Sequence, residues 1–524
     1  MKTQINNMNN MYQGISNFFI SLDKISKFVM LSGLIISFYS FFFFISNKIY
    51  LIGSDAFYYM SIADSIIDYG EIKDLTTIPS KPLLTPQNGI VFVHFILSLI
   101  GLTAKGRILS IVVINYLLYI SAIYPLYKTA QLCGLKKGLP LVSLLSVYLG
   151  AWHLYRINLL AINDGIFNSL TLWFVYIVIK FVRDIDGFES KFLNKKAIYK
   201  TLIIYFFITV LIQFRLNAAL LIGSAIISAI LARKIKAFML LLTGGFLLFL
   251  TFISIYSIVE VPSLESSGVR RLYRMFWEVY TLYNVKVLLW KILPILVSGL
   301  SRFNNLISAL IFSIFPLSMI YCGYKGIKNK NFYILFIAII CLSGLWFTLS
   351  FPRTRYILYS FPFIYLILLS FKKIRLIGYG FVLFVFLQSM QNFYIGFSRG
   401  PESKLNLFIY EQNISLPENA LLSSYNRRHP YFILGTRNYL GDDNWDSILK
   451  QIEAPGKFMP KLTLDLIINN GSLFVLGNST YIDSTYSQVN EMAINNGYML
   501  HSSPLTPPFD EFDGWALVEL NLSK

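Results

Sequence analysis

The chain has 524 residues, of which 55% are hydrophobic, 16% aromatic and only 14% charged. An ordinary soluble domain carries about 25% charged residues, so a water-soluble protein of this composition would lack the polar groups that cover its surface. The composition is also the reverse of the low hydrophobicity and high charge that keep a chain disordered. A soluble globular protein and a disordered one are both excluded, and an α-helical polytopic membrane protein is predicted.

The charge balance is basic, with 45 Lys and Arg against 27 Asp and Glu and a formal net charge of +18. In membrane proteins basic residues gather in the cytoplasmic loops, so we attribute the excess to topology and expect no nucleic-acid partner. The three cysteines, Cys133, Cys322 and Cys341, show no paired spacing. Neither a disulfide framework nor a zinc site is indicated.

The first apolar run, Phe28 to Ser46, follows Lys24 and Lys27 and is not succeeded by a small-residue cleavage site. This pattern is typical of an uncleaved signal anchor, with residues 1–24 as a cytoplasmic tail and 47–107 as the first external loop. Within that loop, Gly89–Leu102 is shorter than the roughly 20 residues needed to cross a bilayer, and we interpret it as an interfacial helix.

With this interpretation the connections predicted to lie inside are short and nearly all basic, as the positive-inside rule requires. The chain is then expected to cross the membrane about eleven times within a transmembrane domain at 25–397. The remaining spans are predicted near Ile108–Tyr127, Gly138–Trp152, Gly165–Val182, Ala197–Phe214, Leu216–Ala232, Ala237–Ile258, Leu306–Tyr321, Phe332–Phe351, Tyr356–Ser370 and Leu376–Tyr394.

An odd number of spans places residues 398–524 outside, opposite the N-terminus. The composition of this segment shifts to Asn, Ser, Pro, Gly and Asp. Leu473–Leu476 and Ala516–Leu520 are typical of strands, and Trp445–Ile452 and Gln488–Asn496 have helical periodicity. We therefore expect a small exported α/β domain at the end of the chain.

The first external loop carries the first candidate acid, Asp55, just before a helix-forming stretch. Ile62, Ala63, Ile66 and Ile67 recur at helical spacing, which predicts an amphipathic helix lying along the membrane surface. Asp55 would begin this helix, either as its N-cap or as an acid close to both bilayer and substrate.

Other carboxylates of the loop have simpler interpretations. Asp64 and Asp68 fall on the polar side of the same helix and are predicted to form a solvated face. Glu71 and Asp74 are interpreted as ordinary loop charges.

The second candidate acid is Asp164, which precedes the predicted span from Gly165 at the outer mouth of the bundle. A carboxylate at the edge of the hydrocarbon is costly and is a functional candidate by default, although capping the following helix is an equally good explanation.

Several basic residues lie on the outer side, against the positive-inside expectation. Together with Lys81 they would ring the outer opening of the bundle with positive charge suited to phosphate oxygens. Snorkelling, or pairing with outer carboxylates such as Glu260 and Glu265, is the alternative for about half of them. These residues are Arg215, Arg270, Arg271, Arg274, Arg353 and Arg355.

A carboxylate beside cations at the lipid boundary suits the transfer of a sugar from a polyprenyl-phosphate donor to a hydroxyl of a glycan, lipid or protein. Asp55 would act as general base, and Lys81 with the outer arginines would neutralise the departing phosphate. No cofactor and no metal are expected.

The order of these features resembles the GT-C glycosyltransferases, in the branch of protein mannosyltransferases and aminoarabinose lipid A transferases. The resemblance implies that Asp55, followed by the aromatic Tyr58 and Tyr59, is the catalytic acid of the first loop and that Asp164 is the second acid. The family's Lys-Pro-Pro element matches Lys81-Pro82-Leu83, and its phosphate-binding Arg-Tyr pair matches Arg355-Tyr356, which opens a late span. The expected site for the lipid phosphate and the donor also contains Tyr58, Tyr59, Lys81, Arg215 and Arg353.

The oligosaccharyltransferase branch is less similar, because its Trp-Trp-Asp signature is absent and Asn444-Trp445-Asp446 has a single Trp. The case for a divalent metal weakens with it, and the four histidines, His94, His153, His429 and His501, are interpreted as packing or loop residues.

Two rival functions stay open. A polysaccharide polymerase or O-antigen ligase also handles polyprenyl-phosphate glycans. A lipid-linked glycan flippase is disfavoured because the predicted span centres are almost uniformly apolar. For the transferase we expect the bacterial inner membrane, with the chemistry on its outer face.

Overall fold

The computed structural model describes most of the helical part of the chain and the core of its C-terminal part. The described residues are 22–46, 54–70, 73–74, 81–82, 88–135, 137–159, 162–186, 195–215, 217–258, 305–350, 357–397, 421–424, 438–440, 464, 467–468, 471–477, 479–506 and 516–523.

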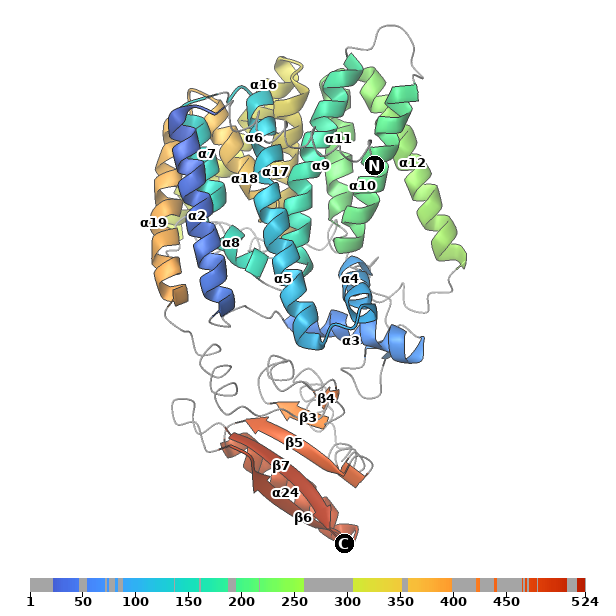
Figure 1. Ribbon diagram of the computed structural model, residues 1–524. Helices are drawn as coiled ribbons and strands as arrows, with labels where there is room; N and C mark the ends of the chain where they lie inside the picture. Colours follow the sequence, from blue (N-terminus) through green and yellow to red (C-terminus); the bar gives the residue numbers. More distant parts are fainter. Residues whose placement is uncertain are drawn as a thin grey trace, which may run out of the picture. The chain divides into compact units, whose positions relative to one another are not determined.

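The chain divides into two compact units (Figure 1). The first unit consists of Met1–Ser46, Val113–Leu159 and Asn163–Tyr394, and the second of Asn47–Val112, Leu160–Ile162 and Ile395–Lys524. The described helices are α2 (Lys24–Ser46), α3 (Ser54–Tyr69), α4 (Asn88–Leu99), α5 (Ala104–Ser121), α6 (Ile123–Leu132), α7 (Leu139–Gly150), α8 (Trp152–Leu159), α9 (Asn163–Asp186), α10 (Lys195–Phe214), α11 (Ala218–Leu231), α12 (Ile235–Ile258), α16 (Asn305–Lys328), α17 (Phe332–Ser350), α18 (Phe361–Ser370), α19 (Arg375–Phe397) and α24 (Ser479–Asn495).

Each predicted span overlaps a described helix, and the protein is an integral membrane protein. Within the described residues, four helical stretches are long and apolar enough to cross a bilayer: Lys24–Ser46, Gly106–Leu132, Asn163–Ile185 and Lys195–Phe214. Several further apolar helices in this part of the chain are shorter, such as Leu139–Gly150 and Phe361–Ser370, so the number of crossings stays a prediction. Helix α8 was not predicted, because this eight-residue helix mixes His, Arg and Asn with apolar residues and is too short for a clear period.

The first unit is a helical bundle in which α9 contacts α6, α8, α10 and α12, and α17 contacts α11, α16 and α18 (Figure 1). Its interior contains hydroxyl groups that need partners where water is absent. Tyr119 donates to the carbonyl of Tyr148 at 2.6 Å and Tyr148 donates back to the carbonyl of Tyr119 at 2.9 Å, with the rings stacked at 4.8 Å. This reciprocal pair joins α5 to α7 without leaving either phenol unsatisfied.

The N-terminus of α2 is fixed by Asp23. Its carboxylate accepts hydrogen bonds from the backbone amide and hydroxyl of Ser26, each at 2.8 Å, which is an N-cap, and from the amide of Gly138 at 3.1 Å. Gly138 has a φ of 80°, a conformation that glycine adopts without strain, and immediately precedes α7. One side chain therefore joins the starts of α2 and α7.

The C-terminal part of the second unit contains a five-stranded sheet in the order β4-β3-β5-β7-β6. Its strands are β3 (Leu421–Ser424), β4 (Asn438–Leu440), β5 (Ser472–Gly477), β6 (Met499–Pro504) and β7 (Ala516–Ser523). β3 is parallel to β4 and β5, whereas β7 is antiparallel to β5 and β6. The two predicted strands are β5 and β7, and the predicted helix at Gln488–Asn496 is the second half of α24.

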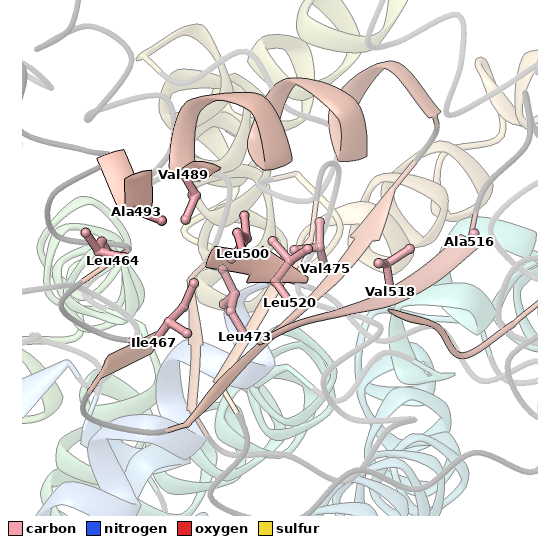
Figure 2. Packing of buried hydrophobic residues seen from close by; sticks show 10 residues of the cluster. All are labelled: Leu464, Ile467, Leu473, Val475, Val489, Ala493, Leu500, Ala516, Val518 and Leu520. Atoms are coloured by element: carbon pink, nitrogen blue, oxygen red, sulfur yellow. The ribbon is translucent and has the colours of Figure 1, made fainter. Parts of the chain in front are cut away.

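Helix α24 covers one face of this sheet, with Val489 and Ala493 directed at strand residues such as Val475 and Leu500 (Figure 2). All of these side chains are at most 3% exposed. The predicted small α/β domain is thus confirmed, and the predicted helix at Trp445–Ile452 lies outside the described residues.

Candidate active site

The first candidate acid lies at the start of α3. The helix begins at Ser54, so Asp55 is in its first turn, as the sequence predicts. Tyr58 and Tyr59 follow in the next turn, and Tyr59 is buried at 5% exposure. The side chains of Asp55 and Tyr58 are outside the described residues.

The prediction that Asp64 belongs to a solvated face is wrong. Asp64 is 3% exposed, and its carboxylate accepts two hydrogen bonds from Arg107, Nη1 to Oδ1 at 2.6 Å and Nη2 to Oδ2 at 3.1 Å. Arg107 lies in the first turn of α5 and is fully buried. Helical periodicity placed Asp64 on the polar face of the helix. The ion pair could not be predicted, because Arg107 is far along the chain and an Arg near the start of a span resembles a snorkelling residue.

His94 lies in α4 and is fully buried, which confirms its interpretation as a packing residue. Neither of its ring nitrogens has a hydrogen-bond partner within the described part of the chain. Burial, with the positive charge of Arg107 as a smaller cause, lowers the pKa of His94 from 6.5 to about 3. The imidazole is therefore neutral at physiological pH and does not compete with Arg107 for the charge of Asp64.

Lys81 is held in a short antiparallel pair. Strand β1 (Lys73–Asp74) pairs with β2 (Lys81–Pro82), and Asp74 is directly opposite Lys81 in the register. Strand β1 also contacts α3. Asp74, interpreted from sequence as an ordinary loop charge, is therefore part of the strand pair that places the backbone of Lys81 near α3. The side chain of Lys81 lies outside the described residues.

The second candidate acid, Asp164, is in the first turn of α9 and forms an ion pair with Arg215, which follows α10. The side chains are 1% and 7% exposed. The neighbouring Asn163 donates its amide to the carbonyl of Phe214 at 2.7 Å. Arg215 was expected in the donor site, with snorkelling or pairing with a carboxylate as the alternatives, and the structure shows it paired with a carboxylate.

The packing around this ion pair is tight on two sides. A Cβ on Gly165 would lie 2.8 Å from Cγ of Asn115, which is itself fully buried. One turn further along α9, the ring of Phe167 meets that of Tyr359 edge to face, with centroids 5.7 Å apart. Tyr359, three positions after Tyr356, therefore packs against the first turns of α9.

The remaining predicted basic residues lie outside the described part of the chain. These are Arg270, Arg271, Arg274, Arg353 and Arg355, together with Tyr356. Among the described residues, no three His, Cys, Asp or Glu side chains are grouped as a metal site would require.

No protein-family model and no curated protein matches this sequence. Among solved structures, ArnT from Cupriavidus metallidurans in the apo state has a TM-score of 0.52 at 13% identity, covering 93% of this chain and 97% of that one. The structure of ArnT bound to undecaprenyl phosphate has the same coverage, with a TM-score of 0.42 at 10% identity.

The archaeal oligosaccharyltransferase AglB from Archaeoglobus fulgidus, in complex with an inhibitory peptide and a dolichol-phosphate, has a TM-score of 0.47 at 10% identity. The match covers 80% of this chain but only 65% of AglB, so this chain spans just under two thirds of that protein. The likeness to apo ArnT, by contrast, runs along nearly the whole of both chains.

This chain has the GT-C fold. The GT-C fold confirms the prediction of a polytopic helical membrane protein with a small C-terminal domain. Of the two candidate acids, Asp55 lies in the first turn of α3, in the second unit, and Asp164 lies in the first turn of α9, in the first unit.

Proposed function

We propose that this protein is a glycosyltransferase that moves a sugar from a polyprenyl-phosphate donor to a hydroxyl acceptor at the outer face of a bacterial inner membrane. The observation that carries the proposal is the position of Asp55 in the first turn of α3, directly after the first apolar helix of a GT-C fold. ArnT, whose fold this chain shares, is bound to undecaprenyl phosphate in one of its structures, which supports a donor of this class.

In the proposed reaction the acceptor oxygen attacks the anomeric carbon of the donor sugar. Asp55 takes the proton of that hydroxyl, the bond between the anomeric carbon and the phosphate oxygen breaks with inversion, and polyprenyl phosphate leaves. General base catalysis contributes about 10²- to 10⁴-fold to such a step. The leaving phosphate gains negative charge, which fixed cations stabilise most strongly where water is excluded.

Which residues supply this positive charge depends on the ion pair between Asp164 and Arg215. Arg215 and Asp164 neutralise one another, so in our proposal Arg215 contributes through this pair and does not act alone on phosphate. Lys81, Arg353 and Arg355 then supply the cationic charge, with Tyr356 beside them. The contact between Phe167 and Tyr359 brings Tyr359, four positions after Arg355, to the first turns of α9.

The test is a transfer assay with the purified full chain in liposomes, offered a panel of undecaprenyl-phosphate sugars and hydroxyl acceptors. Asp55→Asn is expected to abolish turnover while folding and donor-lipid binding are retained. Asp483→Asn, at an exposed position of α24, is the matched control and should keep wild-type turnover. Wild-type turnover in Asp55→Asn would exclude Asp55 as the base, and absence of transfer from every donor would reject the proposed donor class.

The proposed orientation has a separate test. Single cysteines at Thr85 and Ser423, in a chain without the three native cysteines, should both react with an impermeant maleimide added outside sealed cells. Labelling of Ser423 only after permeabilisation would place the C-terminal domain inside and reject the orientation.

A further inference from the structure

The ion pair between Asp64 and Arg107 has a geometry that fixes direction. The guanidinium approaches the carboxylate with two separate nitrogens on two separate oxygens, at 2.6 and 3.1 Å. Such a two-pronged contact restrains rotation as well as distance, which a single lysine contact does not. It joins the middle of α3 to the first turn of α5.

The pair is also costly to separate. Both residues are buried, with Arg107 at 0% and Asp64 at 3% exposure, and removing one partner of a buried ion pair is strongly destabilising. A rotation or a slide of α3 would separate the charges without offering either of them water. His94, fully buried on α4, has no hydrogen bond to either partner. Among the described residues, Arg107 is the counter-ion of Asp64.

The helix transmits this restraint to its own first turn. Asp55 precedes Asp64 by nine positions on α3, which is about two and a half helical turns and roughly 14 Å along the axis. The two residues therefore lie on opposite faces of the helix. Fixing the face that carries Asp64 fixes the direction in which the face carrying Asp55 is presented.

We propose that the Asp64–Arg107 pair is a positioning device that sets the rotation of α3 and thereby orients Asp55 for proton abstraction. The catalytic part of this inference rests on the proposed function, whereas the restraint on α3 does not. Asp64 and Arg107 are positioning residues and contact no substrate in this scheme. A displacement of about 1 Å at a reacting group lowers turnover by as much as 10²-fold.

The decisive variant is the double substitution Asp64→Leu/Arg107→Met. Replacing both partners of a buried ion pair by apolar residues of similar size is often neutral or stabilising, so the fold is retained while the directional contact is lost. We expect kcat for the donor identified by the transfer assay to fall about 10- to 100-fold with KM changed less than about twofold. Arg107→Lys keeps the charge but loses the fork, and should give a smaller loss of kcat.

A second readout needs no turnover. A nitroxide label at Ser54→Cys, in a chain without native cysteines, reports the mobility of the first turn of α3. The label is expected to be more mobile in the double variant and in Arg107→Lys than in the parent. In the matched control, Asp184 and Lys200 are both replaced by uncharged residues. Their partly exposed ion pair, with Nζ of Lys200 2.5 Å from Oδ2 of Asp184, is then lost, and neither kcat nor label mobility should change.

The outcomes separate the two proposals. If no donor supports transfer, the proposed function fails, and the mobility of the label still decides whether the pair restrains α3. If the double variant does not fold, Arg107→Lys carries the test. Wild-type kcat together with wild-type mobility in whichever of these variants folds would overturn the positioning role.

Discussion

Asp164 and Arg215 form an ion pair in which both side chains are almost fully buried, at 1% and 7% exposure. The carboxylate lies in the first turn of α9 and the guanidinium follows the last turn of α10. The pair therefore joins two helix ends, and the two residues depend on each other for their charge. In the sequence they are only an acid and a cation at the outer ends of two different predicted spans.

This dependence predicts strong non-additivity. Asp164→Asn or Arg215→Gln alone removes one partner of a buried ion pair and should lower the free energy of unfolding by about 3–5 kcal/mol. The double variant should recover a large part of that loss, because neither charge remains. Thermal unfolding of the four proteins in a mild detergent checks this, and losses that simply add would show that the pair is not coupled.

Gly165 directly follows Asp164 and packs against Asn115. In Gly165→Ala the new Cβ would lie 2.8 Å from Cγ of the buried Asn115, so either this side chain or the start of α9 has to shift. We expect a loss of about 1–3 kcal/mol, as for other overpacked sites. The matched control is Gly223→Ala on α11, where a Cβ meets nothing within 4 Å, and it should be neutral or slightly stabilising. Equal unfolding temperatures for the two variants would contradict the predicted clash.

His94 predicts a loss of stability in mild acid. Its pKa is lowered to about 3 in the folded chain from 6.5, so between these values the unfolded chain binds a proton that the folded chain does not. The free energy of unfolding is therefore unaffected by His94 above pH 6.5 and decreases as the pH falls below this value, by about 2 kcal/mol at pH 5. His94→Phe should flatten this dependence between pH 7 and pH 5. An unchanged pH profile in the variant would assign the acid sensitivity elsewhere.

Asp23 predicts an effect of the same sign at lower pH. Hydrogen bonds from the backbone and then the hydroxyl of Ser26, with a smaller part from the amide of Gly138, lower the pKa of Asp23 from 3.8 to about 2. Its stabilisation is present above pH 3.8 and is lost as the pH falls through this range to about 2. Asp23→Ala should cost about 0.5–2 kcal/mol at pH 7.

The difference in the free energy of unfolding between Asp23→Ala and the wild type should then shrink as the pH falls from 4 to 2. Thermal unfolding at each pH measures this difference. Asp23→Asn is the control, because it keeps an oxygen that accepts the cap hydrogen bond but does not titrate. If the deficit of the alanine variant were the same at both ends of this range, the carboxylate would not be the group responsible.

The class of the protein and the outline of its fold could be predicted from the sequence. Apolar runs long enough to cross a bilayer must be helices, because backbone groups in lipid find partners only within their own segment. The order of Asp55, the Lys81-Pro82 loop, Asp164, Arg355-Tyr356 and the C-terminal segment suggested a GT-C fold. The second half of α24, with β5 and β7, followed from their periods of 3.6 and 2. These features depend on residues close together in the chain, so a single sequence is enough to predict them.

Which polar groups meet could not be predicted from the sequence, because it depends on how the helices pack. Asp64 had the spacing of a solvated residue, yet the approach of α5 buries it on Arg107. Arg215 had the position of a phosphate ligand, yet it is paired with Asp164. The physical reason is that a charge within a membrane protein is stable only beside its partner, and which partner arrives depends on how distant helices pack.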